Sequence, residues 1–153
     1  MNQVRAEFIE VTVDKFIFKI KRDCAYSNEG VWLYRDGDRV RVGLTDFVQQ
    51  SSGDMAFVIV AAAGSSLRAG DELCTVETVK VAVSVRSPIS GTVRDVNADL
   101  DASPELVNED PYGAGWLAAI EASDWHGESS ALLDAEAYAQ LMRGQAEEET
   151  QKR

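Results

Sequence analysis

Lys80 is the side chain with the clearest chemical potential in this sequence, and it lies inside a long β-prone stretch over residues 71–91. From Val79 to Val85, valine alternates with other residues, as in a strand with one apolar face. The stretch is too long for one ordinary strand, so we expect two strands with a reversal near residues 78–80. The amine would then stand at a hairpin tip. There it is either a solvated lysine that discourages edge pairing or a covalent attachment point.

Other reactive side chains are few. Cys74 falls within a predicted strand and is expected to be a small buried residue. Cys24 follows Lys21 and Arg22, which would lower the pKa of its thiol, but we expect a bystander thiol because no histidine is nearby. His126 is the single histidine and is expected to be an exposed loop residue. Triads and multi-histidine metal sites are therefore excluded, and no glycine-rich phosphate loop is found.

Length and charge narrow the function classes further. The chain has 153 residues, of which 45% are hydrophobic, and this suits one domain with a buried core. Its formal net charge of −11, from 26 acidic and 15 basic residues, disfavours nucleic acid and anionic membrane surfaces as partners. No run approaches the roughly 20 apolar residues that span a bilayer, and residues 1–5 lack a signal-peptide pattern. We expect a cytoplasmic protein of a prokaryote.

The elements that would position these residues fall into three segments. β-Prone runs at residues 8–13 and 16–20 would form a hairpin or a strand along the edge of the core. We assign them to an N-terminal extension over residues 1–25. A main domain over residues 26–144 follows. Residues 145–153 are expected to form a charged tail that is frayed from residue 147 onward.

The main domain is expected to be rich in short strands. Thr45 resembles the N-cap of a short helix that reaches about Ser51. A C-terminal helix would begin at Ser129 or Ser130 and stop at Gly144. The other expected elements are strands at 31–34, 39–44, 55–60, 92–96 and 116–120 and one helical turn at 105–108. Many short strands in one small domain indicate a β-sandwich or flattened barrel.

Several motifs occur in a fixed order and carry a family resemblance. Residues 77–80 read Glu-Thr-Val-Lys, similar to the lipoylation motif of the glycine cleavage system H proteins. The segments at 42–49 and 87–91 resemble two further motifs of that family. Most specific is Pro-Glu-Leu-Val-Asn-Glu-Asp-Pro-Tyr-Gly at residues 104–113, which is nearly the family signature. The resemblance covers residues 31–142.

The resemblance implies a particular fold. It is the hammerhead of lipoyl domains, a mainly β structure in which two antiparallel sheets form a flattened barrel or sandwich. Short helices would lie at the periphery together with the C-terminal helix, and Lys80 would be presented on a hairpin. Trp32, Tyr112 and Trp116 are expected to be core residues first, and site residues only by proximity.

The resemblance also implies a non-catalytic carrier with lipoate in amide linkage to Lys80. The flanking Glu77, Thr78, Val79 and Val81 would be recognised by a lipoate ligase or lipoyltransferase and would form the surroundings of the arm. The lack of catalytic motifs agrees with a carrier, because the cofactor itself supplies the redox and group-transfer chemistry.

Three partner enzymes follow from the resemblance. In H proteins the arm accepts an aminomethyl group from glycine decarboxylase and offers it to a tetrahydrofolate-dependent aminomethyltransferase. Dihydrolipoamide dehydrogenase then reoxidises the arm. An acidic surface would favour encounter with basic patches on such partners.

Two departures from the family pattern keep other functions open. Residues 81–84 read Val-Ala-Val-Ser where H proteins have Ala-Ala-Ser-Asp, and Gly-Val-Trp at residues 30–32 lacks the family's histidine. One alternative is an H-like lipoate-binding protein serving a heterodisulfide-reductase-like complex in sulfur oxidation, with the arm carrying sulfur or electrons. Another is an adaptor with an unmodified Lys80. Biotin carriage is disfavoured because that family has methionine on both sides of its lysine, where Val79 and Val81 stand.

Overall fold

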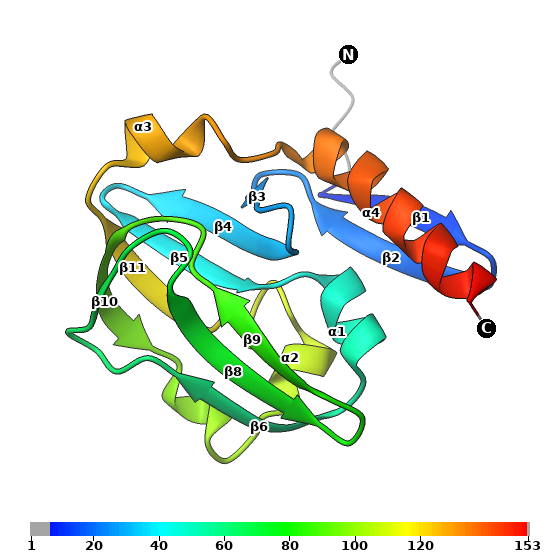
Figure 1. The fold of residues 1–153 in the computed structure, drawn as a ribbon, viewed down its shortest axis with the longest axis horizontal. Coiled ribbons are helices and arrows are strands. Elements are labelled where there is room, and N and C mark those ends of the chain that lie inside the picture. The colour runs from blue at the N-terminus through cyan, green and yellow to red at the C-terminus, as the bar shows by residue number, and fades with distance from the viewer. Residues whose placement is uncertain (1–6, 153) are drawn as a thin grey trace.

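The computed structural model describes residues 7–152 and arranges its strands in three antiparallel sheets (Figure 1). The largest has the order β3-β4-β5-β11-β10-β7, formed by Ala25–Tyr26, Val31–Asp36, Arg39–Leu44, Ala118–Ala122, Gly91–Val96 and Ser66–Leu67. The second has the order β6-β8-β9, formed by Met55–Val60, Glu72–Thr78 and Ala82–Arg86. The third is a hairpin of β1 (Phe8–Val13) and β2 (Phe16–Lys21).

The six-stranded and three-stranded sheets share one hydrophobic core, which we call the main core. Alternation along the strands points every second side chain inward, so Val40 and Val42 of β5 and Val76 of β8 are fully buried. Ile89, just before β10, is buried with them. This confirms the expected mainly β architecture, with two packed antiparallel sheets and helices at the periphery.

Short helices connect the strands. The prediction that Thr45 caps the first helix is confirmed, since its Oγ1 accepts a hydrogen bond from the backbone N–H of Val48 at 3.3 Å. That helix, α1, spans Asp46–Ser52. The others are a 3₁₀ turn at Ala98–Leu100, α2 at Leu106–Glu109, α3 at Trp125–Ser129 and α4 at Ala135–Gln151. Of the two arrangements predicted for residues 8–20, the structure shows the hairpin.

The hairpin β1–β2 packs against α4 and builds a second hydrophobic core, which we call the terminal core (Figure 1). The apolar residues of the hairpin alternate and share the face that is covered by Tyr138 and Met142 of α4. Tyr138 also stacks on Tyr26 with ring centroids 4.6 Å apart. Its hydroxyl lies 2.9 Å from Thr45 Oγ1, which ties α4 to the start of α1.

Side chains of the main domain hold the outer edge of β2. Asp46 accepts a hydrogen bond from the backbone N–H of Lys19 at 2.9 Å. Gln50 donates to the carbonyl oxygen of Ile17 at 3.0 Å, and the Tyr112 hydroxyl donates to that of Lys19 at 2.7 Å. The hairpin is therefore fixed to the main domain by polar contacts as well as by apolar packing.

The predicted start of the C-terminal helix was wrong. Ser129 ends the separate helix α3, and a short connection follows before α4 begins at Ala135. Asp134 is the true N-cap, with its Oδ1 accepting a hydrogen bond from the backbone N–H of Ala137 at 2.8 Å. An aspartate at this position is as good an N-cap as a serine.

The predicted end of this helix was also wrong. Gly144 does not stop α4, which continues to Gln151, so residues 147–151 are helical and not frayed as expected. Ala146 explains the difference, because it is buried in the terminal core. Packing of the last turns offsets the roughly 1 kcal/mol by which a mid-helix glycine disfavours the helix.

The three aromatic residues expected in the core differ in burial. Trp32 is fully buried in the terminal core, and its Nε1 donates a hydrogen bond to the carbonyl oxygen of Pro111 at 2.9 Å. Tyr112 and Trp116 are half-buried and pack against the same core. All three thus have structural roles.

Candidate functional site

The site begins with the tight hairpin between β8 and β9. Glu77 pairs with Ala82, which leaves residues 79–81 as the turn, and the predicted reversal is confirmed. Thr78 fixes this turn through its backbone and its hydroxyl. Its N–H donates to the carbonyl oxygen of Val81 at 2.8 Å, and its Oγ1 accepts from the N–H groups of Lys80 and Val81 at 3.2 and 3.1 Å. The tip is therefore held in one conformation by local hydrogen bonds.

Lys80 stands exposed at this tip. Its Cδ and Cε lie 3.8 Å from the place that a Cβ would occupy on Gly53, so the aliphatic part of the side chain passes over the end of α1. Within residues 7–152, no carboxylate lies within ion-pair distance of its ammonium group. The stem of Lys80 thus lies near the end of α1, and its ammonium group has no ion-pair partner among the described residues.

Asn108 supports the surface on which the stem of Lys80 rests. Its Nδ2 donates to the carbonyl oxygen of Gly53 at 2.9 Å and to Gln49 Oε1 at 3.1 Å. Its Oδ1 accepts from the backbone N–H of Met55 at 2.9 Å. One side chain of α2 therefore fixes the connection between α1 and β6. The sequence placed Asn108 in a family motif but gave it no role.

Along the apolar face predicted for residues 79–85, the valine side chains become more exposed from the core toward the hairpin tip. Val85 is buried and Val83 is half-buried, whereas Val81 is 47% and Val79 is 90% exposed. The five candidate residues, Lys80, Glu77, Thr78, Val79 and Val81, thus lie together on the hairpin. The amine therefore stands between two exposed valines on a tip that is open to solvent.

The two cysteines are buried and away from this tip. Cys24 does not have the lowered pKa that its basic neighbours suggested, because burial first and the charge of Asp23 second raise it to about 12. Burial also raises the pKa of Cys74 to about 12, with a smaller contribution from Glu72. Both thiols are therefore protonated at neutral pH and are poor nucleophiles.

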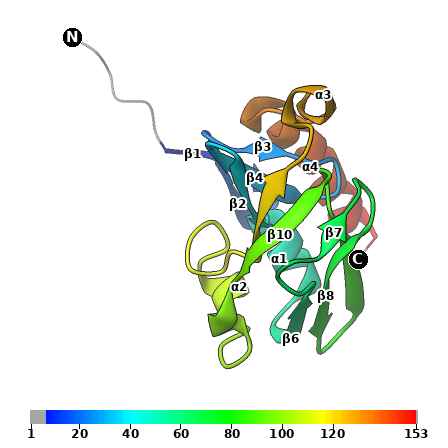
Figure 2. The same cartoon turned by 90° about the vertical axis from the view of Figure 1, so that its left-hand side faces the viewer.

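His126 is exposed as expected, but it belongs to α3 and not to a loop. Both ribbon views place α3 at the opposite end of the molecule from the β8–β9 tip (Figures 1 and 2). Among the described residues, no group of three or more His, Cys, Asp and Glu side chains could hold a metal ion.

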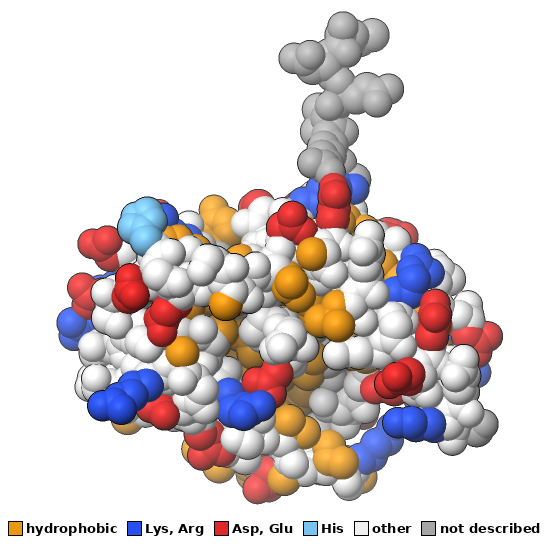
Figure 3. All heavy atoms as spheres, turned by 45° about the horizontal axis from the view of Figure 1, so that its top comes forward, with side chains coloured by type: hydrophobic (Ala, Val, Ile, Leu, Met, Phe, Trp, Pro, Cys, Tyr) orange, Lys and Arg blue, Asp and Glu red, His pale blue; other side chains and the backbone are white. Residues whose placement is uncertain are grey.

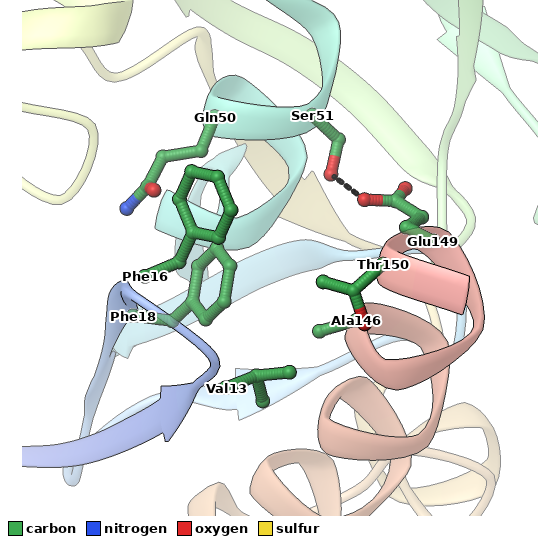
Figure 4. Close-up of a pocket in the computed structure, with 8 residues that line it drawn as sticks. All are labelled: Val13, Phe16, Phe18, Gln50, Ser51, Ala146, Glu149 and Thr150. Carbon is green, nitrogen blue, oxygen red and sulfur yellow. Dashed lines mark hydrogen bonds between the residues drawn. The ribbon is translucent and has the colours of Figure 1, made fainter. Parts of the chain in front are cut away.

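A small apolar cleft lies between the hairpin β1–β2, α1 and α4 (Figure 4). Its volume is about 50 Å³, and its walls include Val13, Phe16 and Ala146. Ser51 Oγ donates a hydrogen bond to Glu149 Oε2 at 3.0 Å across its edge. The cleft contains no residue of the Lys80 hairpin.

The surface charge is dispersed. On the face drawn in Figure 3, acidic side chains are spread widely and basic side chains lie among them. Within the described part of the chain, no helix is both long and apolar enough to cross a bilayer.

Two packed antiparallel sheets that present a lysine on a rigid hairpin define the class of lipoyl-domain carriers. A sequence model of the glycine cleavage H-protein family matches residues 24–145. The glycine cleavage system H protein of Mycobacterium avium is 49% identical over 123 residues, which are 78% of this chain and 93% of that protein. The H protein of Carboxydothermus hydrogenoformans is 41% identical over 128 residues, covering 84% and 98%.

A solved structure agrees with the sequence comparisons. The crystal structure of an H protein from Mycobacterium marinum superposes with a TM-score of 0.72 at 31% identity, covering 79% of this chain and 97% of that one. The chain therefore belongs to the glycine cleavage H-protein family. It is a lipoyl carrier, a non-catalytic component of a multienzyme system whose cofactor is covalently bound lipoate.

The family match does not include everything that folds with the domain. It begins at residue 24, after the hairpin β1–β2, and ends at residue 145, whereas α4 continues to Gln151. The two segments outside the match meet each other in the terminal core.

Proposed function

We propose that Lys80 is the residue that carries the lipoyl group. The observation that supports this most directly is an exposed amine, free of ion pairs with described residues, at a hairpin tip that Thr78 holds rigid. The cofactor, when bound, supplies a disulfide for electron transfer and sulfur atoms for group transfer. The chain contributes position, because the stem of Lys80 passes beside Gly53 while the side chain remains exposed.

Attachment requires only acyl transfer. The deprotonated amine of Lys80 attacks the carbonyl carbon of an activated lipoyl donor, an acyl adenylate or a thioester. A C–N bond forms, the bond to the AMP or thiol leaving group breaks, and the proton of the amine passes to a base of the attaching enzyme. That enzyme is a lipoate ligase or lipoyltransferase, which we propose recognises Glu77, Thr78, Val79 and Val81 around the amine.

The system that this carrier serves is glycine cleavage. Its individual partners in our proposal are glycine decarboxylase, the aminomethyltransferase and dihydrolipoamide dehydrogenase, met in the cytoplasm. The net charge of −11 would speed encounter with basic surfaces on these enzymes. We also propose that residues 1–25 form an accessory segment and that residues 26–144 form the carrier domain proper.

Intact mass after co-expression with a lipoate ligase tests the attachment. We expect one lipoyl increment, lost in Lys80→Arg and kept in Lys15→Arg. Lys15 is a matched control because it is also an exposed lysine in a hairpin turn, between β1 and β2. A protein without the increment would instead be an unmodified adaptor, and an increment that persists in Lys80→Arg would move the site elsewhere.

Bicarbonate exchange into glycine tests the pathway. The lipoylated protein should support exchange by a glycine decarboxylase, and Lys80→Arg should not. Failure of the fully lipoylated protein would favour the alternative, a carrier for the heterodisulfide-reductase-like complex of sulfur oxidation.

A further inference from the structure

The large hydrophobic side chains that remain exposed are concentrated on one sheet. Six such residues are exposed among residues 7–152, and four of them belong to β6 or to the β8–β9 turn. These four are Phe57, Ile59, Val79 and Val81. Phe57 is 61% exposed and Ile59 is 62% exposed. Apolar residues gathered in this way on a rigid surface mark an interaction site more often than scattered ones do.

Phe57 and Ile59 share the outer face of the sheet β6-β8-β9 with acidic neighbours. Phe57 is opposite Glu77 and Ile59 is opposite Thr75 in the pairing of β6 with β8, and residues directly opposite project to the same face. Glu77 lies three residues before Lys80. Standard strand spacings then place Phe57 about 11 Å from the tip, three residues along β8 and one strand across.

The same face carries stable negative charge. Glu72 accepts hydrogen bonds from Thr75 Oγ1 at 2.9 Å and from Ser84 Oγ at 2.8 Å, and these bonds lower the pKa of its carboxyl group. Arg86 is opposite Glu72 in the pairing of β8 with β9, but its guanidinium is ion-paired with Glu29. Between Arg68 and Arg86 the sequence has one further cation, Lys80. The face therefore suits a partner with an apolar patch and basic residues at its rim.

The distance to which an enzyme must approach the Lys80 amine indicates which partner binds this face. An enzyme that attaches the cofactor must bring its active site to the amine itself. A standard interface of about 800 Å² per partner extends roughly 16 Å from its centre, so it includes Phe57. Enzymes that use the finished arm reach it across a tether of roughly 10 Å and need not press against the sheet beside the tip.

We propose that the outer face of β6-β8-β9 is the docking surface for the enzyme that lipoylates Lys80, with Phe57 and Ile59 as apolar anchors and Glu72 and Glu77 as charged contacts. This inference rests on the proposed attachment at Lys80. It extends the recognition surface from the hairpin to β6, a strand that is far from the lysine in sequence.

The test compares steady-state lipoylation of the apo-protein by a purified lipoate ligase. For the double variant Phe57→Ser/Ile59→Ser we expect the KM for the carrier to rise about tenfold or more, with kcat within about twofold. Ile17→Ser is the matched control, because Ile17 is 54% exposed on another sheet, and its KM should not change. Acetylation of Lys80 by a small reagent should proceed equally in all variants, which separates docking from access to the amine.

A charge variant gives an independent measurement. Glu77→Lys should raise the KM and weaken its dependence on salt, whereas Glu147→Lys on α4 should do neither. Holo-protein prepared from the double variant should still serve glycine decarboxylase at the rate of the unaltered carrier. An equal loss with the ligase and the decarboxylase would overturn the assignment of this face to the attaching enzyme.

The two proposals fail in different ways. If the unaltered protein is not lipoylated at Lys80, the proposed function is overturned, and this docking surface with it. If it is lipoylated and the KM of the double variant is unchanged, the docking surface alone is overturned.

Discussion

Replacing Asn108 by alanine is expected to lower the free energy of unfolding by about 3 kcal/mol. The amide of this side chain makes three hydrogen bonds to the connection between α1 and β6, with Gly53, Gln49 and Met55 as partners. The connection lies under the stem of Lys80. The prediction therefore asks whether a single side chain holds the platform of the site.

The magnitude follows from what the deletion leaves behind. A hydrogen bond contributes about 1 kcal/mol net, but a buried group left without its partner costs about 1–3 kcal/mol. Met55 is buried, so its N–H would lose its acceptor where water has little access. Gln49 Oε1 would lose its donor too, whereas Gln49 Nε2 keeps its bond to Asp46 Oδ1. One orphaned N–H and the other lost bonds together give the expected value.

Urea unfolding followed by tryptophan fluorescence measures the change. Asn28→Ala is the matched control, because Asn28 is exposed and should shift the stability by less than about 0.5 kcal/mol. Asn108→Asp keeps the shape of the side chain but turns an oxygen toward the carbonyl of Gly53 and Gln49 Oε1, so it should destabilise at least as much as alanine. If Asn108→Ala matched Asn28→Ala, our account of the platform would be refuted.

Two further predictions concern buried groups. Folding raises the pKa of both Cys24 and Cys74 from 9.0 to about 12. The stability that these two thiols contribute is therefore complete below about pH 9 and is lost as the pH rises toward 12. Urea midpoints at pH 7 and pH 10 should differ less in the Cys24→Ala/Cys74→Ala variant than in the unaltered protein. Ala146→Asp should lower the free energy of unfolding by about 2 kcal/mol or more, because it buries a carboxylate. Glu147→Asp, on the exposed side of α4, should leave the melting temperature nearly unchanged. Equal melting temperatures for the two variants would contradict the packing of α4 beyond Gly144.

Local sequence signals predicted the hairpin that carries Lys80. Valine alternation and strand length predicted a reversal near residue 80, and Thr45 predicted the start of α1. Both predictions were confirmed because these signals act within a few residues. The same alternation did not predict that Val79 and Val81 would be exposed. Exposure depends on where the opposing sheet ends, and this is a property of the assembled fold.

Long-range packing explains what local signals missed. Gly144 and residues 145–151 lack a strong helical pattern of their own, but the terminal core adds apolar contacts that extend α4. The basic neighbours of Cys24 suggested a lowered pKa, but its burial, set by the hairpin and α4, had the larger effect. In both cases α4 packs with the first hairpin, from which more than a hundred residues separate it in sequence.

The role of Asn108 was hidden for a similar reason. Its three partners lie 53–59 residues earlier in the chain, so no spacing rule connects them. The family motif indicated that the segment matters, but only the folded arrangement shows that it braces the lysine hairpin from below.

The terminal core also constrains the order in which this chain can fold during synthesis. Val13 and Ala146 line the same cleft although 133 residues separate them, so the first hairpin leaves the ribosome long before its helical cover exists. Until then the apolar side of the hairpin has no native partner, and we expect nascent chains to depend on chaperones for this interval.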